Sequence, residues 1–104
     1  MSVVLPKKQA ISLDAIAVTS GELVSASLDG EVVILGFQSG SYYSLDQVGA
    51  FIWDLLQKPH KVSELRDAVL NEYEIDRERC EQDLFRLLEE LADKGLVQIK
   101  PEIA

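Results

Sequence analysis

The 104-residue chain has few of the side chains from which metal sites and nucleophilic active sites are built. Its only histidine and only cysteine are His60 and Cys80, whereas a structural zinc site takes four such ligands. A lone cysteine cannot form an internal disulfide, which favours a reducing compartment. The six glycines form no phosphate-binding loop. We therefore expect no metal, no cofactor and no enzymatic activity.

Long apolar runs and targeting signals are also missing. No segment approaches the roughly 20 apolar residues of a membrane span. The N-terminal stretch "MSVVLPKKQA" has no long apolar run after its lysines, so no signal peptide is visible. The hydrophobic content of 47% and charged content of 27% are those of a globular domain. These features predict a cytoplasmic protein without a membrane partner.

Positive charge is scarce. The chain has ten basic and 18 acidic residues, which gives a net charge of −8. Residues 71–94 alone contain nine acidic and four basic residues. A surface of this sign repels phosphate backbones and suits neutral or basic partners. An acidic surface that only keeps the protein soluble is the competing interpretation.

The readable part of the chain begins with three short strands. Apolar residues alternate over 23–28, and an apolar run covers 32–35. Asp29-Gly30 stands between them and is a strong hairpin signal, because both turn residues must accept a positive φ. Residues 38–40, "QSG", indicate a second reversal before "SYYSL", 41–45. The sequence thus predicts a three-stranded antiparallel meander.

The third predicted strand carries two adjacent tyrosines. Since successive side chains of a strand point to opposite faces, Tyr43 and Leu45 share one face while Tyr42 and Ser44 share the other. The sequence leaves open which of the two faces meets a ligand.

Helical spacing starts at residue 48. Asp46 is placed to cap a helix that ends before Pro59, and Ser63 is the candidate cap of a second helix. A third helix starts after Asp76 and stops at Gly95. One stripe of this helix is apolar, with the residues Cys80, Leu84, Leu87, Leu88 and Leu91. "LVQI", 96–99, is either a short strand or a packing contact.

Three strands followed by a three-helix bundle make an α+β fold that also suits a winged helix-turn-helix. In such a protein the recognition helix carries Arg and Lys toward DNA. The third helix here is mostly acidic, so we expect no nucleic-acid partner. An exposed sheet edge offers unpaired N–H and C=O groups to an extended peptide, so peptide binding fits better.

An ordered set of motifs over residues 29–98 resembles the PqqD-like family, also called RiPP recognition elements. In order along the chain the motifs are "LD" (45–46), "IW" (52–53), "VSEL" (62–65), "YEID" (73–76), "EQDL" (81–84) and "LADKGLV" (91–97). No single piece is specific, but the order is. The resemblance implies a domain at 23–104, preceded by an N-terminal arm or extra strand at 1–22.

The function that the resemblance implies is that of a non-catalytic adaptor. Such domains bind the leader segment of a ribosomally made precursor peptide as a fourth strand, between the third strand and the third helix. A stand-alone chain of this kind looks most like the leader-binding protein of lasso-peptide pathways, whose partners are a separate cysteine-protease-like leader peptidase and a macrolactam synthetase. Carried over by motif, the peptide contacts are Tyr42, Tyr43, Ser44, Leu45, Arg79, Cys80, Asp83, Leu84, Arg86 and Leu87.

Two alternatives remain open from the sequence. One is a peptide chaperone for a radical enzyme in the biosynthesis of the quinone cofactor PQQ, and the other is a winged-helix regulator that binds DNA. In the favoured interpretation, Asp83 and neighbouring acids pair with a basic residue or another donor of the leader.

Overall fold

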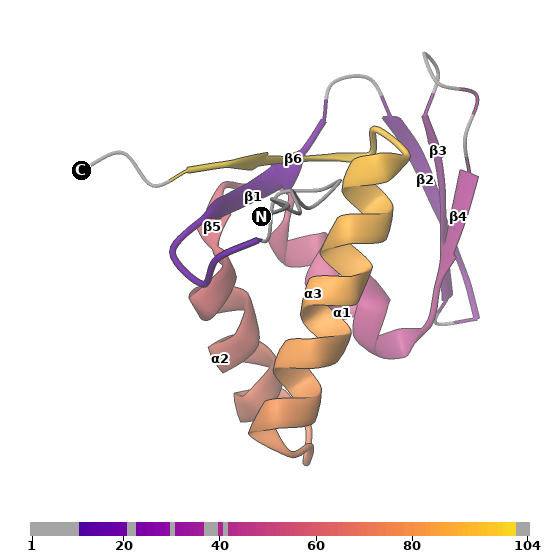
Figure 1. Cartoon of the computed structure of the whole chain (residues 1–104). Coiled ribbons are helices and arrows are strands. Elements are labelled where there is room, and N and C mark those ends of the chain that lie inside the picture. The colour runs from indigo at the N-terminus through magenta and orange to yellow at the C-terminus, as the bar shows by residue number, and fades with distance from the viewer. Residues whose placement is uncertain (1–10, 21–22, 30, 37–39, 41, 102–104) are drawn as a thin grey trace, which may run out of the picture.

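The computed structural model describes residues 11–20, 23–29, 31–36, 40 and 42–101, and Figure 1 shows their arrangement. In chain order the elements are β1 (Ile16–Thr19), β2 (Leu23–Leu28), β3 (Glu31–Gly36), β4 (Tyr42–Leu45), α1 (Gln47–Leu55), β5 (His60–Lys61), α2 (Val62–Glu72), α3 (Arg77–Asp93) and β6 (Val97–Lys100). The predicted α+β fold with a three-stranded antiparallel sheet and three helices is confirmed.

The first sheet has the strand order β2-β3-β4, and both pairings are antiparallel. Leu28 pairs with Glu31, so the β2–β3 connection is a two-residue turn. Asp29 in this turn has φ of 53°, the left-handed conformation that the Asp-Gly pair predicted. Gly30 and most of the "QSG" reversal lie outside the described residues, although Gly40 has φ of 67°.

A second three-stranded sheet, with the order β5-β1-β6, joins distant parts of the chain. Ile16 of β1 lies opposite both Lys61 and Lys100. Ala15 and Ala17, at and just before this strand, are buried in the core. "LVQI" contributes a strand, β6. The division of the chain at residue 22 remains a prediction.

Helix α1 starts directly after β4, and local contacts explain this sharp junction. The Asp46 side chain accepts a hydrogen bond from Gly49 N at 2.8 Å, which confirms the predicted cap. A Cβ on Gly49 would lie 3.1 Å from Leu45 Cδ2 and 3.3 Å from Asp46 Oδ1. Glycine therefore lets the first turn of α1 approach the end of β4 closely.

The predicted cap of α2 is wrong. The cap residue is Lys61 rather than Ser63, and the helix begins at Val62. Val62 N and Ser63 N donate to the carbonyls of Ala15 and Leu13, both at 2.9 Å. Backbone carbonyls of the segment before β1 thus satisfy the first amides of α2, so a hydroxyl cap is not needed.

Helix α3 is the longest helix, and both of its predicted ends are confirmed. The Asp76 side chain accepts from Arg79 N at 3.3 Å, and Gly95 has φ of 73° just after the last turn. The buried stripe of α3 contains Cys80, Leu84, Leu88 and Leu91. Leu87, which the sequence placed in this stripe, is only partly buried.

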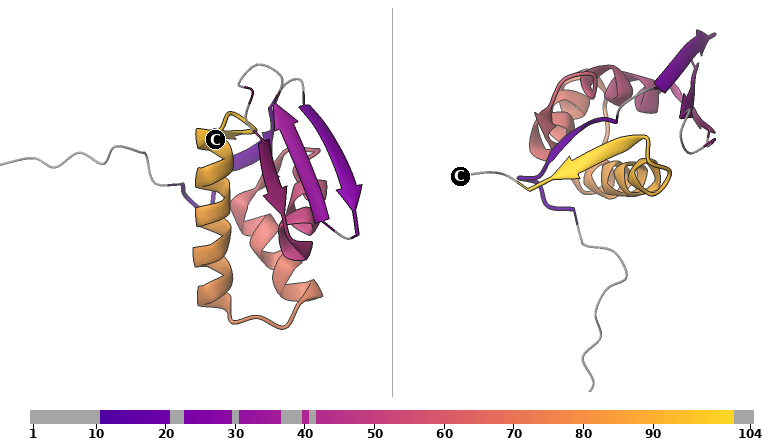
Figure 2. Two further views of the ribbon diagram at one scale, coloured as in Figure 1. Left: turned by 90° about the vertical axis from the view of Figure 1, so that its right-hand side faces the viewer. Right: turned by 90° about the horizontal axis from the view of Figure 1, so that it is seen from above.

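The core lies between the helices and the inner face of the first sheet. Ile34 of β3, Leu45 of β4 and Trp53 of α1 belong to the same buried cluster as the α3 stripe. Figure 2 shows α3 running alongside the first sheet, next to β4. This arrangement places an edge strand beside a long helix.

Candidate functional site

A groove lies between β4 and α3, with a volume of about 260 Å³. We call it the β4–α3 groove. Its lining consists of Tyr43, Ser44, Leu45, Asp46, Val48, Gly49, Ile52, Val69, Ile75, Cys80, Asp83, Leu84, Arg86, Leu87 and Glu90. One long wall is thus an edge strand, and the other is a face of α3 (Figures 1 and 2).

The strand wall presents a free backbone edge. In the described part of the chain β4 pairs only with β3, so alternate residues of β4 direct their N–H and C=O groups away from the sheet. Tyr43 and Leu45 line the groove, and Leu45 is fully buried at its base. Tyr42 is on the opposite face with 69% of its surface exposed. The face that carries Tyr43 and Leu45 is therefore turned toward the groove, and Ser44 of the other face also contributes to the lining.

The helix wall is apolar at its centre. Leu84 is buried at the base, and Leu87 is partly buried above it. Cys80 is also buried, and its Sγ lies 4.0 Å from the Arg66 carbonyl oxygen. Burial raises the pKa of the Cys80 thiol, with a further contribution from the nearby Glu81 carboxylate. Burial together with a raised pKa is typical of a cysteine that packs in a core.

Charged side chains form the rim of the helix wall. Arg86 Nη2 lies 3.1 Å from Asp83 Oδ1, and Arg79 Nε lies 3.7 Å from Asp83 Oδ2. Asp83 therefore stands between two guanidinium groups of its own helix. Arg79 lies outside the groove lining, and its side chain reaches the site through this ion pair.

One hydrogen bond connects the two walls. The Tyr43 hydroxyl donates to Glu90 Oε2, and Lys94 Nζ lies 6.0 Å from the centre of the Tyr43 ring. The hydrogen bond to Glu90, together with desolvation, raises the pKa of Tyr43 to about 12. The phenol is thus a neutral donor at physiological pH.

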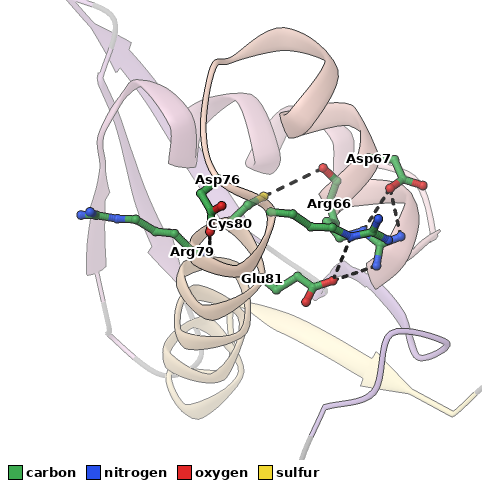
Figure 3. A network of polar contacts seen from close by, with 7 residues as sticks. Arg66, Asp67, Asp76, Arg79, Cys80 and Glu81 are labelled. Carbon is green, nitrogen blue, oxygen red and sulfur yellow. Dashed lines mark hydrogen bonds and ion pairs between the residues drawn. The ribbon is translucent and has the colours of Figure 1, made fainter.

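A buried arginine joins α2 to the N-terminal part of α3 (Figure 3). Arg66 Nη1 lies 2.9 Å from Glu81 Oε2, and Arg66 Nη2 lies 3.0 Å from Asp67 Oδ1. Hydrogen bonds to Asp67 and Glu81 raise the pKa of Arg66. The ion pair to Glu81 joins α2 to α3, the helix that carries Cys80 and Asp83, and so helps to position the helix wall of the groove.

The structure brings most of the predicted site residues together. Eight of them line the groove: Tyr43, Ser44, Leu45, Cys80, Asp83, Leu84, Arg86 and Leu87. Tyr42 and Arg79 do not. Tyr42 lies on the outer sheet face beside Leu35 and Val33, which are 40% and 41% exposed. The contact roles of all ten residues remain a prediction.

Sequence reasoning missed seven lining residues: Asp46, Val48, Gly49, Ile52, Val69, Ile75 and Glu90. The first four belong to the β4–α1 junction, which closes one part of the groove. Glu90 lies seven residues after Asp83. This two-turn spacing puts both residues on one face of α3 and could have identified Glu90 as a lining residue.

Other site types are not found in the described residues. No group of three or more His, Cys, Asp or Glu side chains is placed to hold a metal ion there. No helix in the same ranges has the length and apolar character that crossing a membrane requires.

Comparisons with known proteins agree with this geometry. The family model of coenzyme PQQ synthesis protein D (PqqD) matches residues 31–97. TbiB1, solved in complex with the TbiA(β) leader peptide, is 43% identical with a TM-score of 0.71, over 78% of this chain and 94% of that chain. A lasso peptide synthetase B1 complexed with the leader peptide is 27% identical with a TM-score of 0.68, over 79% and 96% of the two chains.

A search of curated proteins found no match. The family model nevertheless covers well over half of the chain, and its matched region contains β3, β4, all three helices and therefore both walls of the groove. The chain belongs to the PqqD family.

Proposed function

We propose that the protein is an adaptor of lasso-peptide biosynthesis that binds the leader segment of a precursor peptide in the β4–α3 groove. The observation that carries this proposal is a free strand edge, β4, facing an apolar helix wall across the groove. Two similar proteins of known structure have a leader peptide bound.

The mechanism follows from the two walls. The leader adds to β4 as a further strand, and main-chain hydrogen bonds give affinity that tolerates many sequences. Alternate side chains of the leader then enter the groove beside Tyr43 and Leu45 and meet Leu84 and Leu87 of α3. Apolar contact at the centre and charges at the rim select among leaders.

The protein contributes no chemical step in this proposal. Its task is to present the leader to a cysteine-protease-like leader peptidase and to a macrolactam synthetase. These enzymes approach a surface other than the groove, and the exposed apolar side chains of the outer sheet face, Val33, Leu35 and Tyr42, are available to them. The leader must also be released, so moderate affinity suffices.

Fluorescence anisotropy with labelled peptides tests the proposal. The probes are the TbiA(β) leader peptide and the leader segments of precursors encoded beside this protein's own gene. We expect saturable binding at tens of micromolar or tighter. If none of these peptides binds at such concentrations, the proposal is wrong.

A pair of leucine variants locates the binding site. Leu87→Ala removes apolar contact area from the groove, and we expect affinity to fall about fivefold, since burying each CH₂ contributes about 0.8 kcal/mol and only part of this side chain becomes newly buried. Leu70→Ala changes a partly buried leucine of α2 that does not line the groove, so it should leave affinity unchanged. Equal affinities of the two variants would place the peptide elsewhere.

The family model favours one alternative, a peptide chaperone in coenzyme PQQ synthesis. Genes for a lasso precursor, peptidase and synthetase beside this gene support the lasso pathway, whereas a gene for a radical enzyme supports the alternative. A salt-dependent titration with DNA tests the winged-helix regulator: salt-sensitive DNA binding would contradict the charge argument.

A further inference from the structure

The helix wall of the groove carries two carboxylates whose surroundings differ. Asp83 is flanked by Arg86 at 3.1 Å and Arg79 at 3.7 Å. Glu90 takes part in no ion pair within the described residues, and its hydrogen bond there comes from the neutral Tyr43 hydroxyl. Among the described residues Glu90 thus has no cationic partner at ion-pair distance, whereas Asp83 has two.

The hydrogen bond between Tyr43 and Glu90 crosses the groove from β4 to α3. Tyr43 projects from the groove face of β4, which is the face on which alternate side chains of an added strand also stand. A ligand side chain beside Tyr43 consequently enters the space that this hydrogen bond spans.

The Glu90 carboxylate is exposed at the rim of the empty groove, where water can also solvate it. A peptide strand that covers this rim removes that water together with the Tyr43 donor, so the carboxylate then needs another partner. Its strongest partners are ammonium and guanidinium groups, because a hydrogen bond between ions is roughly twice as strong as one between neutral groups. The nearest lysine of α3, Lys94, lies over the Tyr43 ring and forms no ion pair with Glu90. Arg86, one turn before Glu90 on α3, is paired with Asp83. A cation of the bound peptide is therefore the partner that the Glu90 carboxylate lacks.

We propose that Glu90 selects a basic side chain of the bound peptide. A Lys or Arg of the added strand replaces the Tyr43 hydroxyl as the partner of the Glu90 carboxylate. The Tyr43–Glu90 hydrogen bond is thus the contact of the empty groove, and the ion pair is the contact of the complex. The inference rests on the proposed function and deepens it, because it names the class of leader that this groove takes.

The spacing along α3 limits the preference to one peptide position. Asp83 and Glu90 are seven residues apart, about 10.5 Å along the helix. Side chains on one face of an extended peptide repeat about every 6.7 Å. Asp83 and Glu90 therefore face different peptide side chains, and only the residue near Glu90 meets an unpaired carboxylate.

The test is a scan of the TbiA(β) leader peptide in which each position in turn carries Lys, Gln or Glu. Affinities are measured by competition against the labelled parent peptide at low ionic strength. We expect one position at which Lys binds about three- to tenfold more tightly than Gln, and Glu more weakly than either. Added salt should shrink these differences.

Three variants test whether Glu90 causes the preference for Lys in the peptide. Glu90→Gln should abolish the preference for Lys, so that the Lys and Gln peptides bind alike. Glu89→Gln changes net charge equally at a neighbouring α3 residue outside the groove lining, so it should retain the preference. Tyr43→Phe removes the competing hydroxyl, and the preference should be retained or increased.

Two results would overturn the inference without touching the proposed function. One is wild-type protein that binds the Lys, Gln and Glu peptides alike at every position. The other is a preference that persists unchanged in Glu90→Gln. If instead the wild-type protein binds neither the TbiA(β) leader nor any leader encoded beside its gene, the proposed function fails, and the inference fails with it.

Discussion

Removing the hydroxyl group of Tyr43 is the simplest test of how the two groove walls are joined. Tyr43→Phe keeps the ring that packs beside the core and under Lys94, and removes only the donor to Glu90. The pKa of Tyr43 is raised from 10.0 to about 12, which converts to roughly 2.7 kcal/mol if taken in full. Because the phenol lies at a solvent-exposed rim, we discount this to about 1 kcal/mol.

The raised pKa also fixes the sign of the pH dependence. The unfolded chain loses the Tyr43 proton near pH 10, while the folded protein keeps it to about pH 12. The contribution to the free energy of unfolding is therefore complete below pH 10 and is lost between pH 10 and pH 12. At pH 11 about half of it should remain.

Urea denaturation of wild type and Tyr43→Phe measures this contribution. Trp53 is the only tryptophan and is buried, so its fluorescence reports unfolding. We expect Tyr43→Phe to be about 1 kcal/mol less stable at pH 7, with the difference roughly halved at pH 11. Equal stability at pH 7, or a difference that stays constant up to pH 11, would refute the reasoning.

Two further variants test the frame around the groove. Asp46→Ala removes the cap of α1 and should lower the free energy of unfolding by about 1 kcal/mol, or the Tm by about 4 °C in calorimetry. Asp46→Asn can still accept the hydrogen bond from Gly49 and should be close to wild type. Equal Tm values for the two variants would contradict the capping role of Asp46. Glu81→Ala leaves the buried Arg66 with Asp67 alone and should lower the free energy of unfolding by about 1–3 kcal/mol in urea, and an unchanged midpoint would show that the pair adds no stability.

The elements that the sequence predicted are those specified by local chemistry. Asp46 and Asp76 cap their helices through contacts three residues away, and Gly95 ends α3 because its left-handed conformation suits glycine. The alternation of Tyr42 and Tyr43 predicted that they lie on opposite faces of the strand, but it left open which face lines the groove. The burial of Leu45, on the same face as Tyr43, is a tertiary feature that the structure supplies.

What the sequence could not predict depends on distant pairings. The second sheet joins residues 16–19 to 97–100 and to the two-residue strand β5, which is too short to produce a pattern. The same pairing explains the wrong cap at Ser63, since the acceptor of its amide is the Leu13 carbonyl. Glu90 was missed as a site residue because its partner, Tyr43, is on another element.

Amide hydrogen exchange of β4, measured by NMR with and without the TbiA(β) leader peptide, tests strand addition most directly. If the peptide pairs with the free edge, alternate amides of residues 42–45 whose N–H groups face that edge should exchange much more slowly in the complex, while the amides of β2 should not change. Saturating peptide that protects β2 instead, or leaves the amides of β4 exchanging as in the free protein, would contradict the account.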